Sequence, residues 1–137
     1  MEIRPYLIFK GECQDAIKLY ERTFDSKITD VMRFSDMPES SDDTMSIPDD
    51  KNDWIVMSKL SMGDSFIRLS DTIGELKDAV SERVTIVVEM EVDLIKKSFN
   101  VLAEEGNIGI PLQKSFFSPL FGVVHDKYGV MWTFVGQ

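Results

Sequence analysis

The sequence predicts an α+β protein made of two βαβββ modules whose curved mixed sheets enclose a cleft. Residues 5–24 run from an apolar strand-like stretch into an amphipathic helix, and residues 84–106 repeat that order. Three more strand-like stretches follow each of these units. A repeat of this length is typical of paired modules and not of a solenoid. We therefore expect one domain, residues 1–137, with modules at residues 1–72 and 83–137.

The first module begins with residues 2–9, which are apolar on both faces and predict an interior strand. A helix is expected over residues 14–23. Its inward stripe comprises five apolar side chains spaced three or four residues apart, Cys13, Ala16, Ile17, Tyr20 and Phe24. Residues 27–33 predict a second strand. Residues 54–61 and 66–70 predict a hairpin, because a glycine-containing turn lies between them.

The second module repeats this order after a polar connector over residues 73–82. Residues 84–89 are rich in β-branched side chains and predict a strand. A helix follows and is ended by Gly106. The inner face of that helix comprises Val92, Ile95, Phe99 and Leu102. The last three strands are expected at residues 107–112, 121–125 and 130–135.

The chain is acidic, with 24 Asp and Glu against 15 Lys and Arg and a formal charge of −9. Nucleic acids and anionic membrane surfaces are therefore unsuitable partners. No stretch predicts a membrane span or a signal peptide, which favours a cytoplasmic location. The single cysteine, Cys13, excludes an internal disulfide, and its place on the inner helix face predicts a small buried apolar residue.

The negative charge is concentrated in residues 34–53, where seven carboxylates accompany one lysine. We interpret this segment as a solvated loop. The alternative is an interaction protein whose acidic loop docks on a basic partner, and such binding would weaken as salt is added.

Motifs near both ends carry a family resemblance. The N-terminal motif comprises Pro5-Tyr6-Leu7, Phe9, Gly11, Cys13, Ala16-Ile17, Tyr20 and Phe24. The C-terminal motif comprises Pro111-Leu112-Gln113, Phe116-Phe117, Phe121-Gly122, Asp126-Lys127-Tyr128-Gly129-Val130 and Trp132. The chain thus resembles PhnB-like proteins of the vicinal oxygen chelate superfamily, which includes glyoxalase I, bleomycin-resistance proteins and extradiol dioxygenases. The resemblance implies the paired-module fold and a homodimer. Departures from the usual PhnB-like pattern occur at Leu19, Asp25-Ser26 and Phe117-Ser118.

Metal-dependent members of that superfamily hold a divalent ion with His, Gln or Glu from the first and last strands of each module. The resemblance places these positions at Pro5 and Thr133, which are not such ligands. We therefore expect no catalytic metal and no cofactor. Methyl transfer from S-adenosylmethionine also lacks support, because no glycine-rich nucleotide loop follows a strand. The alternative is a metal-dependent lyase, isomerase or dioxygenase that uses Asp71, Glu89 or His125.

Three polar residues near strand ends need separate interpretations. We interpret His125 as hydrogen-bonded at a strand terminus, and Asp126 as the cap of the turn that follows. Arg68 interrupts an apolar strand, so it must reach solvent or meet an anion, and its guanidinium group suits a carboxylate or a phosphate. The alternative is that Arg68 extends to the rim of the sheet or pairs with Asp71.

The function that this pattern favours is binding of a small, partly apolar organic molecule in the cleft, without a catalytic metal. Four side chains are the ligand-binding candidates, namely Tyr6, Arg68, Phe117 and Thr133. Trp54, Phe116 and Trp132 are further aromatic residues that could line the cleft, although most aromatic residues at strand spacing belong to the core.

Overall fold

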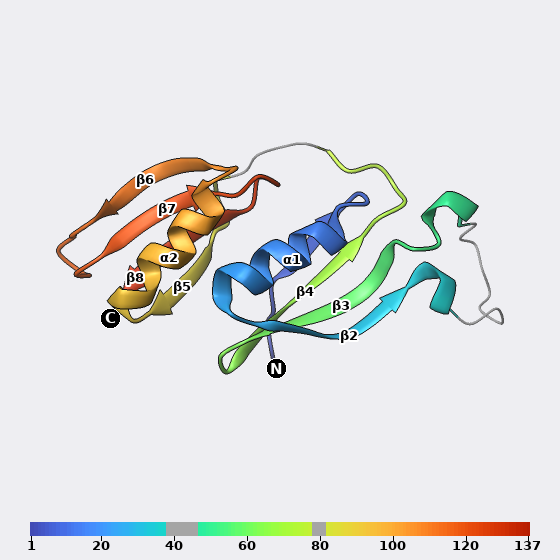
Figure 1. Ribbon diagram of the computed structural model, residues 1–137, viewed down its shortest axis with the longest axis horizontal. Helices are drawn as coiled ribbons and strands as arrows, with labels where there is room; N and C mark the ends of the chain where they lie inside the picture. The colour runs from blue at the N-terminus through green and yellow to red at the C-terminus, as the bar shows by residue number, and fades with distance from the viewer. Residues whose placement is uncertain (38–46, 78–81) are drawn as a thin grey trace. The chain divides into compact units, whose positions relative to one another are not determined.

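The computed structural model describes residues 1–37, 47–77 and 82–137. The chain divides into two compact units, Met1–Lys77 and Asp78–Gln137. In its described residues, each unit has one α-helix and one four-stranded mixed sheet (Figure 1). The predicted α+β class and the order of strand, helix and three strands in each half are confirmed. The single domain, its module limits and the cleft stay predictions. No helix in the described parts is long and apolar enough to cross a membrane.

The sheet of the first unit has the strand order β1-β4-β3-β2, in which only β1 and β4 are parallel. Its strands are β1 (Tyr6–Phe9), β2 (Lys27–Arg33), β3 (Ile55–Met62) and β4 (Ser65–Asp71). The predicted hairpin of β3 and β4 is confirmed, and Gly63 in its turn has a φ of 57°, a conformation that glycine adopts without strain.

The prediction that the first strand is an interior strand is wrong. β1 lies at the edge of its sheet and is shorter than the expected strand. Tyr6 and Ile8 are 50% and 41% exposed. Apolar residues on both faces of β1 therefore do not reflect a central position in the sheet. The face of β1 that carries Tyr6 and Ile8 is exposed.

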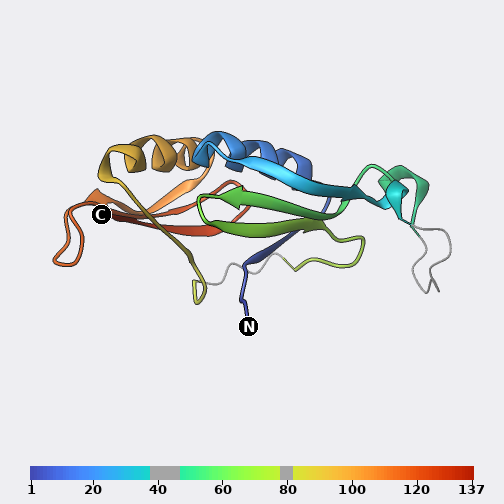
Figure 2. The same cartoon turned by 90° about the horizontal axis from the view of Figure 1, so that it is seen from below.

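Helix α1 (Cys13–Phe24) packs on β2, β3 and β4. Its buried residues are Cys13, Ala16, Ile17, Leu19, Tyr20 and Thr23. The strands contribute Phe9, Ile55, Leu60, Ile67 and Leu69 to the same core. Figure 2 shows each helix on one face of its own sheet, and we call the opposite face of each sheet its helix-free face.

The N-terminus of α1 is held by a carboxylate from β4. Asp71 is 5% exposed, and its Oδ1 accepts hydrogen bonds from the backbone N–H groups of Gly11 at 2.8 Å and Cys13 at 3.0 Å. Its Oδ2 accepts one from the N–H of Ile55 at 3.0 Å. A carboxylate at a helix N-terminus satisfies donors that have no partner within the helix. Asp71 thus fixes α1 to the first residue of β3.

The sheet of the second unit has the order β5-β8-β7-β6, again with one parallel pair, β5 and β8. Its strands are β5 (Ile86–Met90), β6 (Asn107–Gln113), β7 (Phe121–His125) and β8 (Met131–Gly136). Helix α2 (Val92–Ala103) packs on β6, β7 and β8. Its buried residues are Ile95, Ser98, Phe99 and Leu102. The Phe99 and Phe134 rings meet edge to face, 5.9 Å between centroids.

The acidic segment over residues 34–53 begins and ends in short 3-10 helices, η1 (Phe34–Asp36) and η2 (Asp49–Lys51). Residues 38–46, with three of its seven carboxylates, lie outside the described residues. The solvated loop and its alternative role in docking therefore stay predictions.

Candidate ligand-binding site

Two of the predicted ligand contacts lie side by side on the helix-free face of the first sheet. Tyr6 of β1 pairs with Arg68 of β4, which pairs on its other side with Lys59 of β3. The neighbours of Arg68 along β4, Ile67 and Leu69, are 2% and 0% exposed and belong to the core under α1. Because side chains alternate along a strand, Tyr6, Arg68 and Lys59 form a row on the opposite face.

Cationic side chains gather around one aromatic ring on this face. Lys59 Nζ lies 4.1 Å from the centroid of the Phe66 ring, Arg4 Cζ 4.4 Å and Arg68 Cζ 5.5 Å. We call Phe66, Arg4, Lys59 and Arg68 the Phe66 cluster. Beside it, the Tyr6 hydroxyl donates a hydrogen bond to Ser70 Oγ at 3.0 Å. Sequence reasoning identified Arg68 and missed Arg4, Lys59 and Phe66.

The alternative that Arg68 pairs with Asp71 is wrong. Asp71 is three positions from Arg68 along β4, so its side chain lies on the helix side of the sheet. Both of its carboxylate oxygens already accept backbone hydrogen bonds. The same bonds make Asp71 a poor ligand for a metal ion. Over residues 1–37, 47–77 and 82–137, no three His, Cys, Asp or Glu side chains are arranged to hold a metal.

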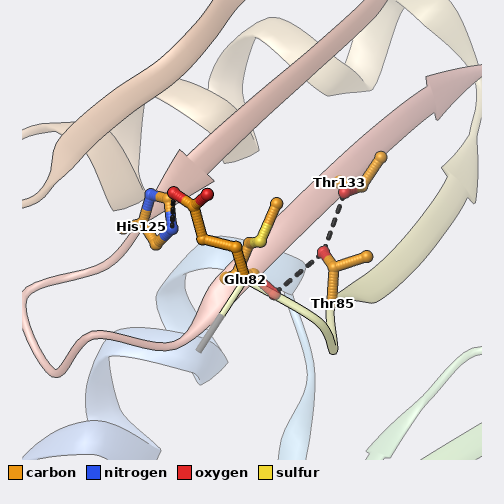
Figure 3. Close-up of polar contacts among 5 residues, drawn as sticks. Glu82, Thr85, His125 and Thr133 are labelled. Atoms are coloured by element: carbon orange, nitrogen blue, oxygen red, sulfur yellow. Dashed lines mark hydrogen bonds and ion pairs between the residues drawn. The ribbon is translucent and has the colours of Figure 1, made fainter. Parts of the chain in front are cut away.

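Thr133 occupies the equivalent place in the second unit. It pairs with Val87 three positions before the end of the parallel β5–β8 ladder, and Arg68 pairs with Tyr6 three positions before the end of the β1–β4 ladder. The Oγ1 atoms of Thr133 and Thr85 are 2.8 Å apart and share a hydrogen bond (Figure 3). The equivalent faces therefore differ in chemistry: the first is cationic here, whereas the second carries a hydroxyl pair.

A cavity of about 320 Å³ lies at the end of β7 in the second unit. It is lined by Glu82, Glu105, Asn107, His125, Asp126, Lys127 and Gly129. Glu105 Oε2 and Lys127 Nζ form an ion pair at 3.2 Å. Figure 3 shows the Glu82 side chain directed at His125, with Oε1 3.9 Å from Nε2.

Among the described residues, one ring nitrogen of His125 does not make the hydrogen bond that was predicted for this side chain. His125 Nε2 is buried and, within the part of the chain that the structure describes, has no hydrogen-bond partner. Glu82, Glu105 and Asn107 were missed as its neighbours. They come from a connector, a helix-to-strand loop and the first residue of β6, respectively, and no periodic pattern in the sequence connects these segments with His125.

Phe117 lies in the segment between β6 and β7 and is 53% exposed. Its ring meets the rings of Phe116 and Phe121 edge to face, with centroids 5.2 Å and 5.0 Å away. Phe116 is fully exposed, whereas Trp132 is completely buried. Phe116 and Phe117 are therefore exposed, whereas Trp132 belongs to the core.

Cys13 is fully buried, as predicted. Its burial, followed by the negative charge of Asp71, raises the pKa of the thiol from 9.0 to about 12. The folded protein thus holds this proton more tightly than the unfolded chain does. The contribution of Cys13 to stability is complete below pH 9 and is lost as the pH rises toward 12.

We therefore expect the free energy of unfolding to fall between pH 9 and 11 by up to about 1.4 kcal/mol per pH unit through this one group. Urea unfolding of the wild type and of Cys13→Ala across that range measures the contribution. The wild type should lose more stability with pH than the variant, which has no thiol. Equal pH dependence in the two proteins would contradict the expectation.

Comparison with known proteins places the chain in a family. Residues 1–135 match the family described as 3-demethylubiquinone-9 3-methyltransferase. The chain belongs to this family. Protein YjdN of Escherichia coli (strain K12) is 32% identical over 139 residues, which cover 96% of this chain and 92% of YjdN.

Solved structures of similar proteins have the same fold. Protein PA1353 from Pseudomonas aeruginosa is 28% identical with a TM-score of 0.84, over 100% of this chain and 98% of that one. A putative 3-demethylubiquinone-9 3-methyltransferase, PhnB protein, from Bacillus cereus is 23% identical with a TM-score of 0.79, over 100% of both chains. The fold that the resemblance to PhnB-like proteins implied is confirmed.

The family's description refers to methyl transfer, and one glycine turn in this member leads from a strand into a helix. Gly11, with a φ of 92°, connects β1 to α1. An anionic cofactor group would bind there through the backbone N–H groups at the start of the helix. The N–H groups of Gly11 and Cys13 already donate to Asp71. A second negative group at this turn would be repelled by that carboxylate.

Proposed function

We propose that the protein binds a small, partly apolar organic molecule, with Tyr6 and Arg68 as its contacts in the first unit and Phe117 and Thr133 as candidates in the second. The observation that carries this proposal is the row on the helix-free face of the first sheet, where Arg68 lies between Tyr6 and Lys59. A guanidinium group beside an exposed tyrosine ring offers a ligand both charge and apolar surface.

The apolar part of this face supports the proposal. Tyr6, Ile8 and Met57 are 50%, 41% and 41% exposed, and the strand register puts all three on the helix-free face. Exposed apolar side chains gathered on one face mark binding surfaces more often than scattered ones do. The second sheet adds a hydroxyl pair at the equivalent place.

We further propose that the protein is a cytoplasmic homodimer. Its resemblance to PhnB-like proteins supports the dimer, and so does the need to cover a sheet face that has no helix. Light scattering at micromolar concentration should give twice the mass of the chain, and a monomer would contradict this part of the proposal.

A metal-dependent lyase, isomerase or dioxygenase is the second candidate. The observation that favours it is His125, whose Nε2 has no hydrogen-bond partner among the described residues and faces the carboxylate of Glu82 at 3.9 Å. Elemental analysis of protein purified without chelators tests it. Stoichiometric Mn, Zn, Ni or Fe that is lost in His125→Ala would favour the enzyme over the binding protein.

We expect small organic compounds from a broad library to raise the melting temperature of the wild type. A compound that binds only the folded state adds about 2.7 kcal/mol of stability at one hundred times its Kd. Tyr6→Ala should reduce these shifts, because it removes an exposed ring from the proposed site. Leu94→Ala is the matched control, since Leu94 on α2 is 54% exposed. A library without stabilising compounds, or equal shifts in both variants, would contradict the proposed function.

A further inference from the structure

The Phe66 cluster combines like charges in a way that folding alone does not explain. Three cationic side chains lie within 5.5 Å of the centroid of one phenylalanine ring. Arg4 has a partner, because its Nη2 lies 3.2 Å from Glu2 Oε2. Within the described residues, neither Lys59 nor Arg68 pairs with a carboxylate. Cations held this close repel one another unless an anion lies between them.

The surroundings of the cluster make this arrangement more unusual. The chain carries a formal charge of −9, so positive side chains are scarce and acidic ones abundant. The cross-strand pairing of Lys59 with Arg68 nevertheless directs two cations to the same place on one face. Like charges opposite each other in a sheet are destabilising. Both side chains are half-buried, which limits the screening that solvent provides.

We infer that the helix-free face of the first unit binds a small organic anion, a carboxylate or a phosphate ester, whose charged group lies between Lys59 and Arg68. This rests on the proposed function and names the class of its ligand. Guanidinium binds both kinds of anion through paired N–H donors, and ammonium adds a point charge. The Phe66 ring contacts both Lys59 and Arg68 and holds them in position.

The rest of the ligand lies on the exposed apolar surface beside the cluster. Tyr6 pairs directly with Arg68 in the register, and its hydroxyl donates to Ser70 Oγ. An aromatic or branched apolar body attached to the anion would contact the Tyr6 ring while the anion meets Arg68. Charge complementarity thus selects the anionic class, and the exposed ring selects molecules with an apolar body over inorganic ions.

The test compares anions with neutral molecules of the same shape. Isothermal titration calorimetry should detect phenyl phosphate or benzoate, whereas benzamide should bind at least 10-fold more weakly because it lacks the charge that the cations recognise. Inorganic phosphate alone should also bind more weakly than phenyl phosphate. Raising NaCl from 20 to 300 mM should weaken the binding of phenyl phosphate by screening the attraction.

Variants separate recognition from folding. Arg68→Gln and Lys59→Gln should each weaken the binding of phenyl phosphate about 10-fold or more. The matched control is Lys18→Gln, the same charge change on the exposed side of α1. Without ligand at low salt, Arg68→Gln and Lys59→Gln should melt at the same or a higher temperature than the wild type, because each relieves repulsion. If either cation stabilised the fold by pairing with a carboxylate of the protein, its substitution would lower the melting temperature instead.

Each outcome has a distinct meaning. If benzamide binds as tightly as benzoate and Tyr6→Ala weakens both, the proposed function stands and the anionic class is wrong. If no library compound or probe binds, both proposals fall. If Arg68→Gln melts several degrees lower than the wild type and leaves the binding of phenyl phosphate unchanged, the cluster serves the fold and the inference is overturned.

Discussion

Asp71→Ala should reduce the free energy of unfolding by about 4 kcal/mol, because three backbone N–H groups lose their acceptor and each unsatisfied buried donor costs roughly 1–3 kcal/mol. The three donors belong to Gly11, Cys13 and Ile55. They lie at the turn before α1, at its first residue and at the start of β3, so the loss affects the N-terminus of the helix and its connection to β3. Urea unfolding followed by circular dichroism measures the change.

Two variants control for the loss of charge and of size at Asp71. Asp71→Asn keeps the shape and one acceptor oxygen but turns an amide N–H₂ toward backbone donors, so we expect about half the loss. Asp53→Ala removes an exposed carboxylate from the same unit and should change stability by less than about 0.5 kcal/mol. Asp71→Ala with the stability of Asp53→Ala would show that the three hydrogen bonds do not hold the first unit together.

The secondary structure was predictable because its signals are local. The repeat of apolar side chains every three or four residues predicted both helices, and the bounds of the first, Cys13–Phe24, differ from the expected ones by one residue at each end. The edge position of β1 was not predictable in this way. Strand order depends on long-range pairing, and the apolar pattern of β1 is the same for an interior strand and for an edge strand with an exposed ligand face.

The Phe66 cluster could have been predicted in part. The two-residue turn of the β3–β4 hairpin fixes the pairing of Met62 with Ser65. Counting outward from that pair puts Lys59 opposite Arg68, so the position of the turn in the sequence is enough to place two cations on one face. By contrast, the approach of Arg4 to Phe66 and of Glu82 to His125 depends on irregular segments, whose path the sequence pattern does not specify.

Two buried acidic residues, one in each unit, show the same difference between local interactions, which were predictable, and long-range ones, which were not. Asp126 was predicted to cap the turn after β7, and its Oδ1 does accept the N–H groups of Tyr128 at 2.9 Å and Val130 at 3.1 Å. This Asx turn is a local interaction, so residue type and position predicted it. Asp71 instead accepts hydrogen bonds from segments far from it in sequence. Its residue type alone had suggested that Asp71 pairs with Arg68 or binds a metal.

Asp126→Ala should reduce the free energy of unfolding by about 3 kcal/mol, nearly as much as Asp71→Ala. Besides the two N–H groups of the turn, Asp126 accepts a buried hydrogen bond from a side chain outside the turn. The Nε1–H group of Trp132 donates to its Oδ2 at 3.0 Å, and Asp126 and Trp132 are 2% and 0% exposed. Asp126→Asn keeps an acceptor for the turn and loses the bond to the indole, so it separates the two contributions. We expect Asp126→Asn to reduce the free energy of unfolding by about 1–2 kcal/mol.

A double-mutant cycle with Trp132→Phe isolates the indole bond. Trp132→Phe removes the donor and leaves a cavity, so alone it should cost about 2–4 kcal/mol. If the Asp126–Trp132 bond stabilises the protein, Asp126→Asn should cost at least about 1 kcal/mol less in the Trp132→Phe background than in the wild type. Additive losses would mean that Asp126 acts through the turn alone. Because the cycle compares the same substitution in two backgrounds, the cavity cancels from the comparison.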